Sequence, residues 1–177
     1  MSRRVGLREF QENLSRRLAS ASAQDNLRSR LAVEAGGRLW LLNLPDVGEV
    51  MSVPWLCRVP LTRRWYCGLV NVRGSLYGMV DLADFCGYGI TPRTSENAFL
   101  MCGRRHAISV GLMVQKVVGL RNAQEFSAVE GVAPDKPWIS SVVQDHERRQ
   151  YLELNVANLV RDPAFMDIGM GIDGASA

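Results

Sequence analysis

The chain has 177 residues, of which 47% are hydrophobic and 22% are charged, the composition of a globular domain that can bury a real core. No apolar run approaches the ~20 residues that a membrane-spanning helix needs. No apolar segment follows the arginines of the N-terminus, as it would in a secretory signal. The sequence therefore predicts a cytoplasmic protein with no direct membrane insertion.

Positive charge is concentrated near the N-terminus. Of the net charge of +3, residues 1–30 contribute +4 and residues 31–177 contribute −1. A nucleic-acid-binding protein usually has a basic face on its folded body. The distribution therefore argues against nucleic acid as a partner, and a solvated helical arm accounts for the N-terminal charge.

Residue types that carry catalysis or bind metals are few and scattered. The four cysteines form no C-x-x-C pair, and the two histidines, His106 and His146, are far apart in the sequence. A zinc site needs close pairs of ligands, and the chain contains no P-loop, nucleophile elbow or H-E-x-x-H motif. The sequence therefore predicts a protein that is not an enzyme and that uses no metal or cofactor.

The first predicted element is an amphipathic helix at residues 6–19. Its apolar side chains recur at steps of three and four residues, with charged residues between them: Leu7, Phe10, Leu14 and Leu18. A linker follows, so that residues 1–28 are predicted to form a helical arm. The apolar stripe can pack on the body of the protein, which is the interpretation we favour, or against a partner.

From residue 30 onward, short extended segments alternate with turn signals. Hairpins are predicted around turns at residues 35–37, 73–74, 103–105 and 144–149, with 106–113 as the second strand of the third. Further extended segments are predicted at 47–54 and 114–120, and short helices at 82–85 and 155–161, the second of them capped by Asn155. Pro163 should end or bend the last helix, and residues 162–177 are predicted to form a tail.

These segments amount to about ten short strands without long crossover helices between them. The pattern favours small antiparallel barrels over a parallel sheet. Because a single small barrel closes with roughly five to eight strands, the strand count indicates two barrels packed together. The predicted fold class is therefore mainly β.

The most informative stretch is residues 59–82, which has the pattern of a strand, a sharp turn and a second strand. The turn contains Arg73 and Gly74, and we expect Gly74 to adopt a positive φ, which glycine does without strain. We expect Asn71 to hydrogen-bond to the turn backbone and Asp81 to cap the helix that follows. Such a corner presents one guanidinium group and no catalytic nucleophile.

This block and its surroundings resemble the CheW-like adaptor domain of bacterial chemosensory arrays. The resemblance covers about residues 29–161 and rests on three segments: Val47-Gly48-Glu49-Val50, Gly68-Leu69-Val70-Asn71-Val72-Arg73-Gly74 and Met79-Val80-Asp81-Leu82. It implies two SH3-like five-stranded β-barrel subdomains around a shared core, with a groove between them. An N-terminal helix and a short C-terminal helix would flank this domain.

The resemblance also implies a function. Such a protein is a non-catalytic adaptor that couples the cytoplasmic tip of a methyl-accepting chemoreceptor to the regulatory domain of a CheA-like histidine kinase, in membrane-associated arrays. The size of the chain and its N-terminal arm are most like the branch of the family that serves type IV pilus twitching motility. A flagellar chemotaxis adaptor is the alternative within the family.

The resemblance places one set of candidate binding residues beside the groove, on the receptor side: Val47, Glu49, Asn71, Arg73 and Gly74. We expect Val47 to supply an apolar contact and Arg73 to supply a planar donor, because the guanidinium fork is rigid and always charged. A purely structural role is an equal alternative, in which Arg73 pairs with Glu49 and locks the corner.

A second set of candidates is expected on the kinase-facing side, in a barrel-to-barrel contact: Trp55, Leu56, Trp65 and Tyr66. Aromatic residues are enriched in interface hot spots. Core packing is the alternative for each tryptophan, since this side chain is highly buried on average.

Two other classes of protein compete with an adaptor. A Cys–His hydrolase would pair one of the cysteines with a histidine, but nothing in the sequence marks any of them as activated: Cys57, Cys67, Cys86, Cys102, His106 and His146. A small barrel can also bind single-stranded nucleic acid through aromatic side chains and a basic groove. The nearly neutral body argues against this second alternative.

Overall fold

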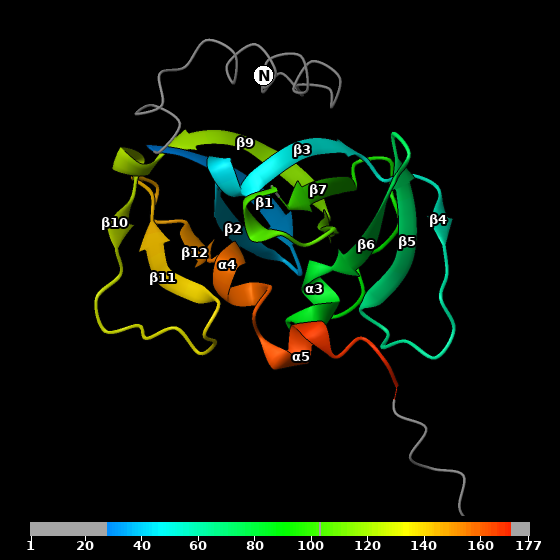
Figure 1. Cartoon of the computed structure of the whole chain (residues 1–177). Helices are drawn as coiled ribbons and strands as arrows, with labels where there is room; N and C mark the ends of the chain where they lie inside the picture. The colour runs from blue at the N-terminus through cyan, green and yellow to red at the C-terminus, as the bar shows by residue number, and fades with distance from the viewer. Residues whose placement is uncertain (1–27, 103, 171–177) are drawn as a thin grey trace, which may run out of the picture.

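The computed structural model describes residues 28–102 and 104–170. The predicted helix at 6–19 and its linker lie outside these residues, as does the end of the predicted tail. Two curved sheets stand side by side, with short helices where they meet (Figure 1). The mainly β prediction is therefore confirmed in its basic architecture.

Each sheet contains five longer strands and a two-residue strand at one edge. Sheet A has the spatial order β10 (Ser127–Ala128), β11 (Ile139–Gln144), β12 (Gln150–Leu154), β2 (Arg38–Asn43), β1 (Ser29–Ala35) and β9 (Lys116–Asn122). Sheet B has the order β3 (Val47–Ser52), β7 (Ala98–Cys102), β8 (Val110–Val114), β6 (Ser75–Asp81), β5 (Tyr66–Val72) and β4 (Leu56–Cys57). The longer strands of the described residues correspond to the ten expected from the sequence.

Within the described residues, the chain starts in sheet A, passes through all of sheet B and returns to sheet A. Most neighbouring strands are antiparallel, whereas β12 pairs in parallel with β2 and β6 pairs in parallel with β8. One predicted strand is shorter than expected, because residues 104–106 form a 3₁₀ helix, η2, and β8 starts only at Val110. Its hairpin pairing with β7 is present.

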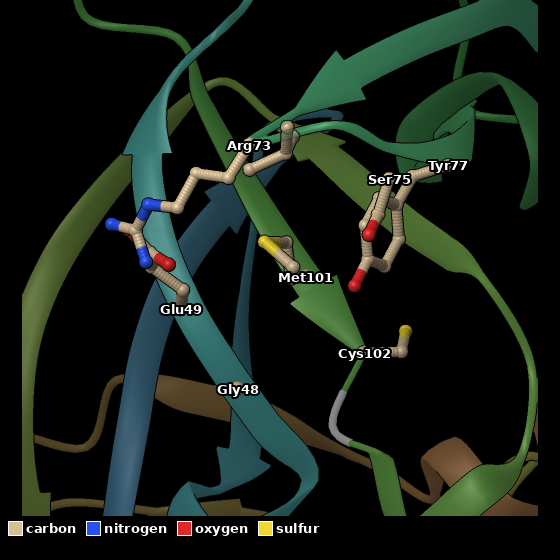
Figure 2. Close-up of a pocket in the computed structure, with 8 residues that line it drawn as sticks. Gly48, Glu49, Arg73, Ser75, Tyr77, Met101 and Cys102 are labelled. Atoms are coloured by element: carbon tan, nitrogen blue, oxygen red, sulfur yellow. The ribbon is translucent and has the colours of Figure 1, made fainter.

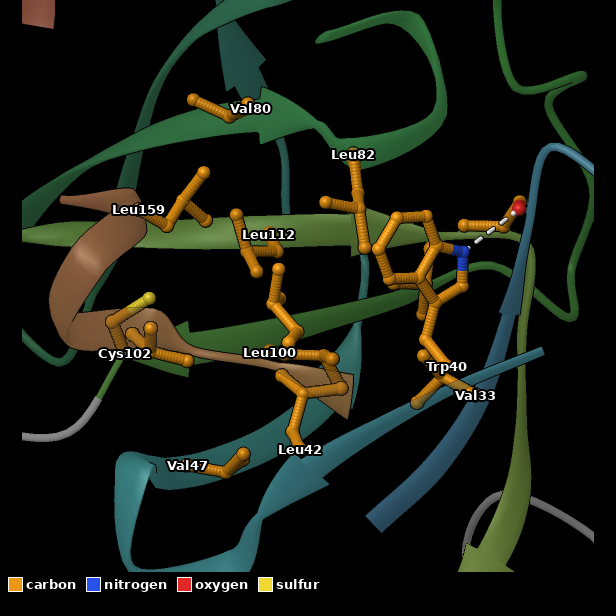
Figure 3. Packing of buried hydrophobic residues seen from close by; sticks show 14 of the residues in the cluster. Val33, Trp40, Leu42, Val47, Val80, Leu82, Leu100, Cys102, Leu112 and Leu159 are labelled. Carbon is orange, nitrogen blue, oxygen red and sulfur yellow. Dashed lines mark hydrogen bonds between the residues drawn. The ribbon is translucent and has the colours of Figure 1, made fainter. Parts of the chain in front are cut away.

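The largest apolar cluster lies between the two sheets and takes side chains from both of them (Figure 3). Strand β7 shows how the alternation of side chains creates it. Ala98, Leu100 and Cys102 point into this shared core, whereas Phe99 points into a smaller cluster enclosed by sheet B. Sheet A encloses a third cluster around Tyr151. Central strands are therefore buried on both faces, which is why they are continuously apolar.

Short helices close the junction between the sheets: η1 (Leu44–Asp46), α3 (Leu82–Phe85), α4 (Val156–Leu159) and α5 (Pro163–Met166), with η3 (Ala123–Glu125) beyond β9. Asp81 and Asn155 cap α3 and α4 as expected, accepting hydrogen bonds from backbone N–H groups. Pro163 opens α5 rather than only ending α4, because Asp162 caps a new turn and proline suits its first position. Phe165 is buried in the shared core, so this part of the predicted tail packs on the body.

No helix among residues 28–102 and 104–170 is long and apolar enough to cross a membrane.

Replacing Leu112 with alanine should test the importance of the shared core. The Leu112 side chain is fully buried between the sheets, so we expect Leu112→Ala to lower the free energy of unfolding by about 2–5 kcal/mol. The measurement is urea denaturation of both proteins. Ile90→Ala is the control, since Ile90 is exposed and should change the free energy by less than about 0.5 kcal/mol. Equal effects would contradict the assignment of the core.

Candidate functional site

The hairpin between β5 and β6 turns through only two residues. Val72 pairs with Ser75, so Arg73 and Gly74 form the loop, with φ values of +51° and +86°. Positive φ at both positions is the signature of a type I′ turn, whose twist matches that of the strands. The Asn71 Oδ1 atom accepts a hydrogen bond from the Gly74 N–H at 2.9 Å. The conformation expected for Gly74 and the bond expected for Asn71 are both present.

Arg73 is an unusual residue for its backbone conformation. The first loop position of a type I′ turn favours asparagine, aspartate or glycine, and a left-handed conformation costs most other L-residues roughly 1–2 kcal/mol. The backbone therefore gives no reason for an arginine here. The Arg73 side chain is 79% exposed, and its guanidinium group is the feature that the corner presents.

Glu49 on β3 is the partner of Arg73 inside the chain. The Arg73 Nη2 atom donates to Glu49 Oε1 at 2.7 Å. An ion pair this exposed contributes at most about 1 kcal/mol to folding, so it orients the guanidinium more than it holds the fold. β3 is an edge strand of sheet B, and the pair thus sits where another chain can approach.

A pocket of about 260 Å³ opens beside this ion pair. Figure 2 shows Ser75 and Tyr77 across from the Arg73–Glu49 pair, with Met101 between them. The lining therefore combines a charged pair, two hydroxyl groups and the thioether of Met101. Such a lining suits a protruding side chain of a partner protein, since it combines an apolar group with a few fixed polar groups.

The sequence interpretation missed Ser75, Tyr77 and Met101. Ser75 and Tyr77 follow Arg73 at steps of two residues, which places them on one face of the hairpin. This alternation was a usable signal for the first two residues. Met101 comes from β7, and nothing in the sequence indicates that β7 would pair with β3.

Val47 differs from its sequence-based expectation. It is only 7% exposed and lies in the shared core near Leu42 and Cys102 (Figure 3). The expected surface contact of the Val47 side chain is therefore wrong. Val47 packs in the core and anchors the start of β3, two residues before Glu49. A β-bulge between Val47 and Glu49 interrupts the alternation of β3, so Val47 points into the core although Glu49, two residues further on, lines the pocket.

Burial raises the pKa values of three cysteine thiols: Cys67, Cys86 and Cys102. Burial, followed by the negative charge of Asp46, raises the pKa of Cys102 to about 12. Burial is also the main reason why the pKa values of Cys67 and Cys86 rise to about 11 and about 12. A thiol that stays protonated is a poor nucleophile. In the described part of the chain, no group of three or more His, Cys, Asp or Glu residues could hold a metal ion.

The four residues expected on the kinase side do not share one surface. Trp55 is 84% exposed in the loop before β4, whereas Leu56 is half-buried against the sheet B cluster. Trp65 is half-buried, with ring centroids 5.1 Å from Phe85 and 6.1 Å from Phe165. Tyr66 covers Gly78, and burial raises the pKa of its hydroxyl. Of the two tryptophans, Trp55 is thus the surface residue and Trp65 packs internally.

Comparison with known proteins gives three consistent matches. The CheW-like domain matches residues 30–164. Protein PilI of Pseudomonas aeruginosa is 26% identical over 146 residues, covering 80% of each chain. The crystal structure of the scaffolding protein TtCheW from Thermoanaerobacter tengcongensis superimposes with a TM-score of 0.61 at 17% identity, covering 72% of this chain and 88% of that one.

The structural match confirms the predicted CheW-like fold of two β subdomains around a shared core, apart from the N-terminal helix, which lies outside the described residues. Members of this family are non-catalytic scaffolds of chemosensory systems. By its fold and its domain match, the chain belongs to the CheW-like family.

Proposed function

We propose that this protein is an adaptor that couples a chemoreceptor tip to a CheA-like histidine kinase. The observation that carries the proposal is the Glu49–Arg73 pair, presented by a strained turn at the rim of a pocket. Backbone strain of this kind persists where the surrounding structure holds it in place, and it gathers at functional sites. The proposed adaptor acts in the cytoplasm and is recruited to membrane-associated arrays.

On the receptor side, a helical hairpin would lie across the corner of sheet B. Arg73 would donate to a carboxylate or carbonyl of the receptor, with Glu49 fixing the direction of the fork. A side chain of the receptor would enter the adjoining pocket between Tyr77 and Met101. Asn71 and Gly74 take part indirectly, because they set the turn that positions Arg73.

On the kinase side, Trp55 is the proposed anchor. A large, exposed aromatic side chain on the loop beside an edge strand can fill a pocket of a partner barrel. Leu56 continues this surface, since it follows Trp55 in the chain and remains half-exposed. Trp65 and Tyr66 are not part of the proposed surface, because they pack against Phe85, Phe165 and Gly78.

The similarity to PilI favours type IV pilus twitching motility as the process that the adaptor serves. Deletion of the gene should abolish the spread of twitching colonies on agar and leave swimming intact. Complementation with the wild-type gene should restore twitching. Loss of swimming with normal twitching would instead support the flagellar alternative.

Replacing Arg73 with asparagine separates binding from folding. Arg73→Asn removes the guanidinium but suits a type I′ turn, so the free energy of unfolding should stay equal or rise by up to about 1 kcal/mol. Loss of a charge-assisted hydrogen bond should weaken receptor binding by about ten- to a hundredfold. Calorimetric titration with a receptor cytoplasmic fragment measures the dissociation constant.

Arg148 offers a matched control for this experiment. It is an exposed arginine with φ of +61° in the hairpin between β11 and β12 of sheet A. Arg148→Asn should leave receptor binding unchanged. Equal weakening in both variants, or unfolding of Arg73→Asn, would contradict the proposed role of Arg73 and favour a purely structural one.

Replacing Trp55 with alanine tests the kinase surface. Because Trp55 makes little contact with the body, stability should change by less than about 0.5 kcal/mol. Binding to the regulatory domain of the kinase should weaken by about tenfold or more, as for an interface hot spot. Receptor binding should be unaffected, and Ile90→Ala, another exposed apolar residue, should change neither affinity. Unaltered kinase binding of Trp55→Ala would remove Trp55 from the interface.

A further inference from the structure

A second pocket, of about 470 Å³, lies at the junction of the two sheets. Its walls come from the end of β2 and η1, from η2 after β7, and from α4 and the residues that follow it. It shares no lining residue with the pocket beside Glu49 and Arg73. Its polar groups are Asn43, Asp46, Arg105, His106 and Arg161.

The single carboxylate in this pocket is already engaged. The Asp46 Oδ1 atom lies 3.0 Å from His106 Nε2, and Asp46 Oδ2 accepts a hydrogen bond from the Asn43 side-chain amide at 3.2 Å. Asp46 and His106 are both largely buried, with side-chain exposures of 16% and 10%. The pair therefore forms a fixed floor that links η1 to η2.

The two arginines of the pocket are, in contrast, exposed and have no partner for their guanidinium groups among the described residues. Neither the Arg105 nor the Arg161 guanidinium makes a hydrogen bond or ion pair with another residue in the described ranges. Some other arginines of the described residues are anchored to carboxylates, for example Arg64 to Asp84 and Arg149 to Asp145. With one carboxylate and two guanidinium groups, the pocket carries net positive charge in either protonation state of His106.

We propose that this pocket binds an oxyanion, a carboxylate or phosphate group, between Arg105 and Arg161. The guanidinium fork matches the geometry of both groups and binds them bidentately. Two like charges around one cavity repel each other until an anion enters, which favours occupancy. A cation is disfavoured by the same excess charge, and an apolar ligand would leave both forks without partners. The site is independent of the proposed receptor and kinase surfaces.

The test follows the arginine side-chain N–H signals of isotopically labelled full-length protein by NMR at constant ionic strength. One titration uses inorganic phosphate and a second uses a blocked tetraglutamate peptide. We expect the signals of Arg105 and Arg161 to shift and to saturate with at least one of the probes. Arg105→Gln and Arg161→Gln should each weaken the binding by about ten- to a hundredfold.

Arg58 and Arg93 provide matched controls, because both are exposed and lie outside the pocket. Arg58→Gln and Arg93→Gln should leave both titrations unchanged. Tighter binding of the peptide would assign the site to acidic side chains of a protein, and tighter binding of phosphate to a phosphorylated compound. Shifts of the wild-type protein that never saturate, or equal losses in pocket and control variants, would overturn the proposal.

Discussion

The apolar cluster between the two sheets is the constraint on which the remaining structure depends. Strands such as β1, β7 and β8 send alternate side chains into this shared core and into the core of their own sheet. A shift of register by one residue would exchange these two sets, so the alternation fixes how each strand lies. Because sheet A closes only after the chain has passed through sheet B, the two sheets and their common core form one structure.

Because the core is well packed, residues at the surface can keep conformations that are unfavourable by themselves. The left-handed Arg73 and the exposed Glu49–Arg73 pair add little or nothing to stability. They persist because β5, β6 and β3 are held by strand pairing and by the apolar side chains beneath them. Val47 and Glu49 have different roles within one motif. Val47 is buried and anchors the strand, whereas Glu49, two residues further on, faces the rim of the pocket.

The sequence predicted those features that depend on local patterns. Hairpins, the Asp81 and Asn155 caps and the Arg73-Gly74 corner follow from turn chemistry and from alternation over a few residues. Features that depend on distant pairing were not predictable from periodicity. The burial of Val47, the contribution of Met101 to the pocket and the internal packing of Trp65 all require knowledge of which strands and helices become neighbours. The start of a new helix at Pro163 was missed for a local reason, since proline can open a helix as well as end one.

The structure has two separate pockets on one rigid body, so that ligands bound at the two pockets would be held in a fixed relative position. Asp46 lies in the floor of the junction pocket, and Glu49, three residues along, lies at the rim of the other, with the buried Val47 between them. A partner at the pocket beside Glu49 would therefore contact β3, and a ligand in the junction pocket would contact η1, the turn that precedes this strand. Each contact is small by itself, but a body that holds several of them in fixed geometry would gain through multivalency in the arrays proposed above. The proposed binding surfaces thus require a rigid core, because motion within the body would increase the entropy cost of binding several partners at once.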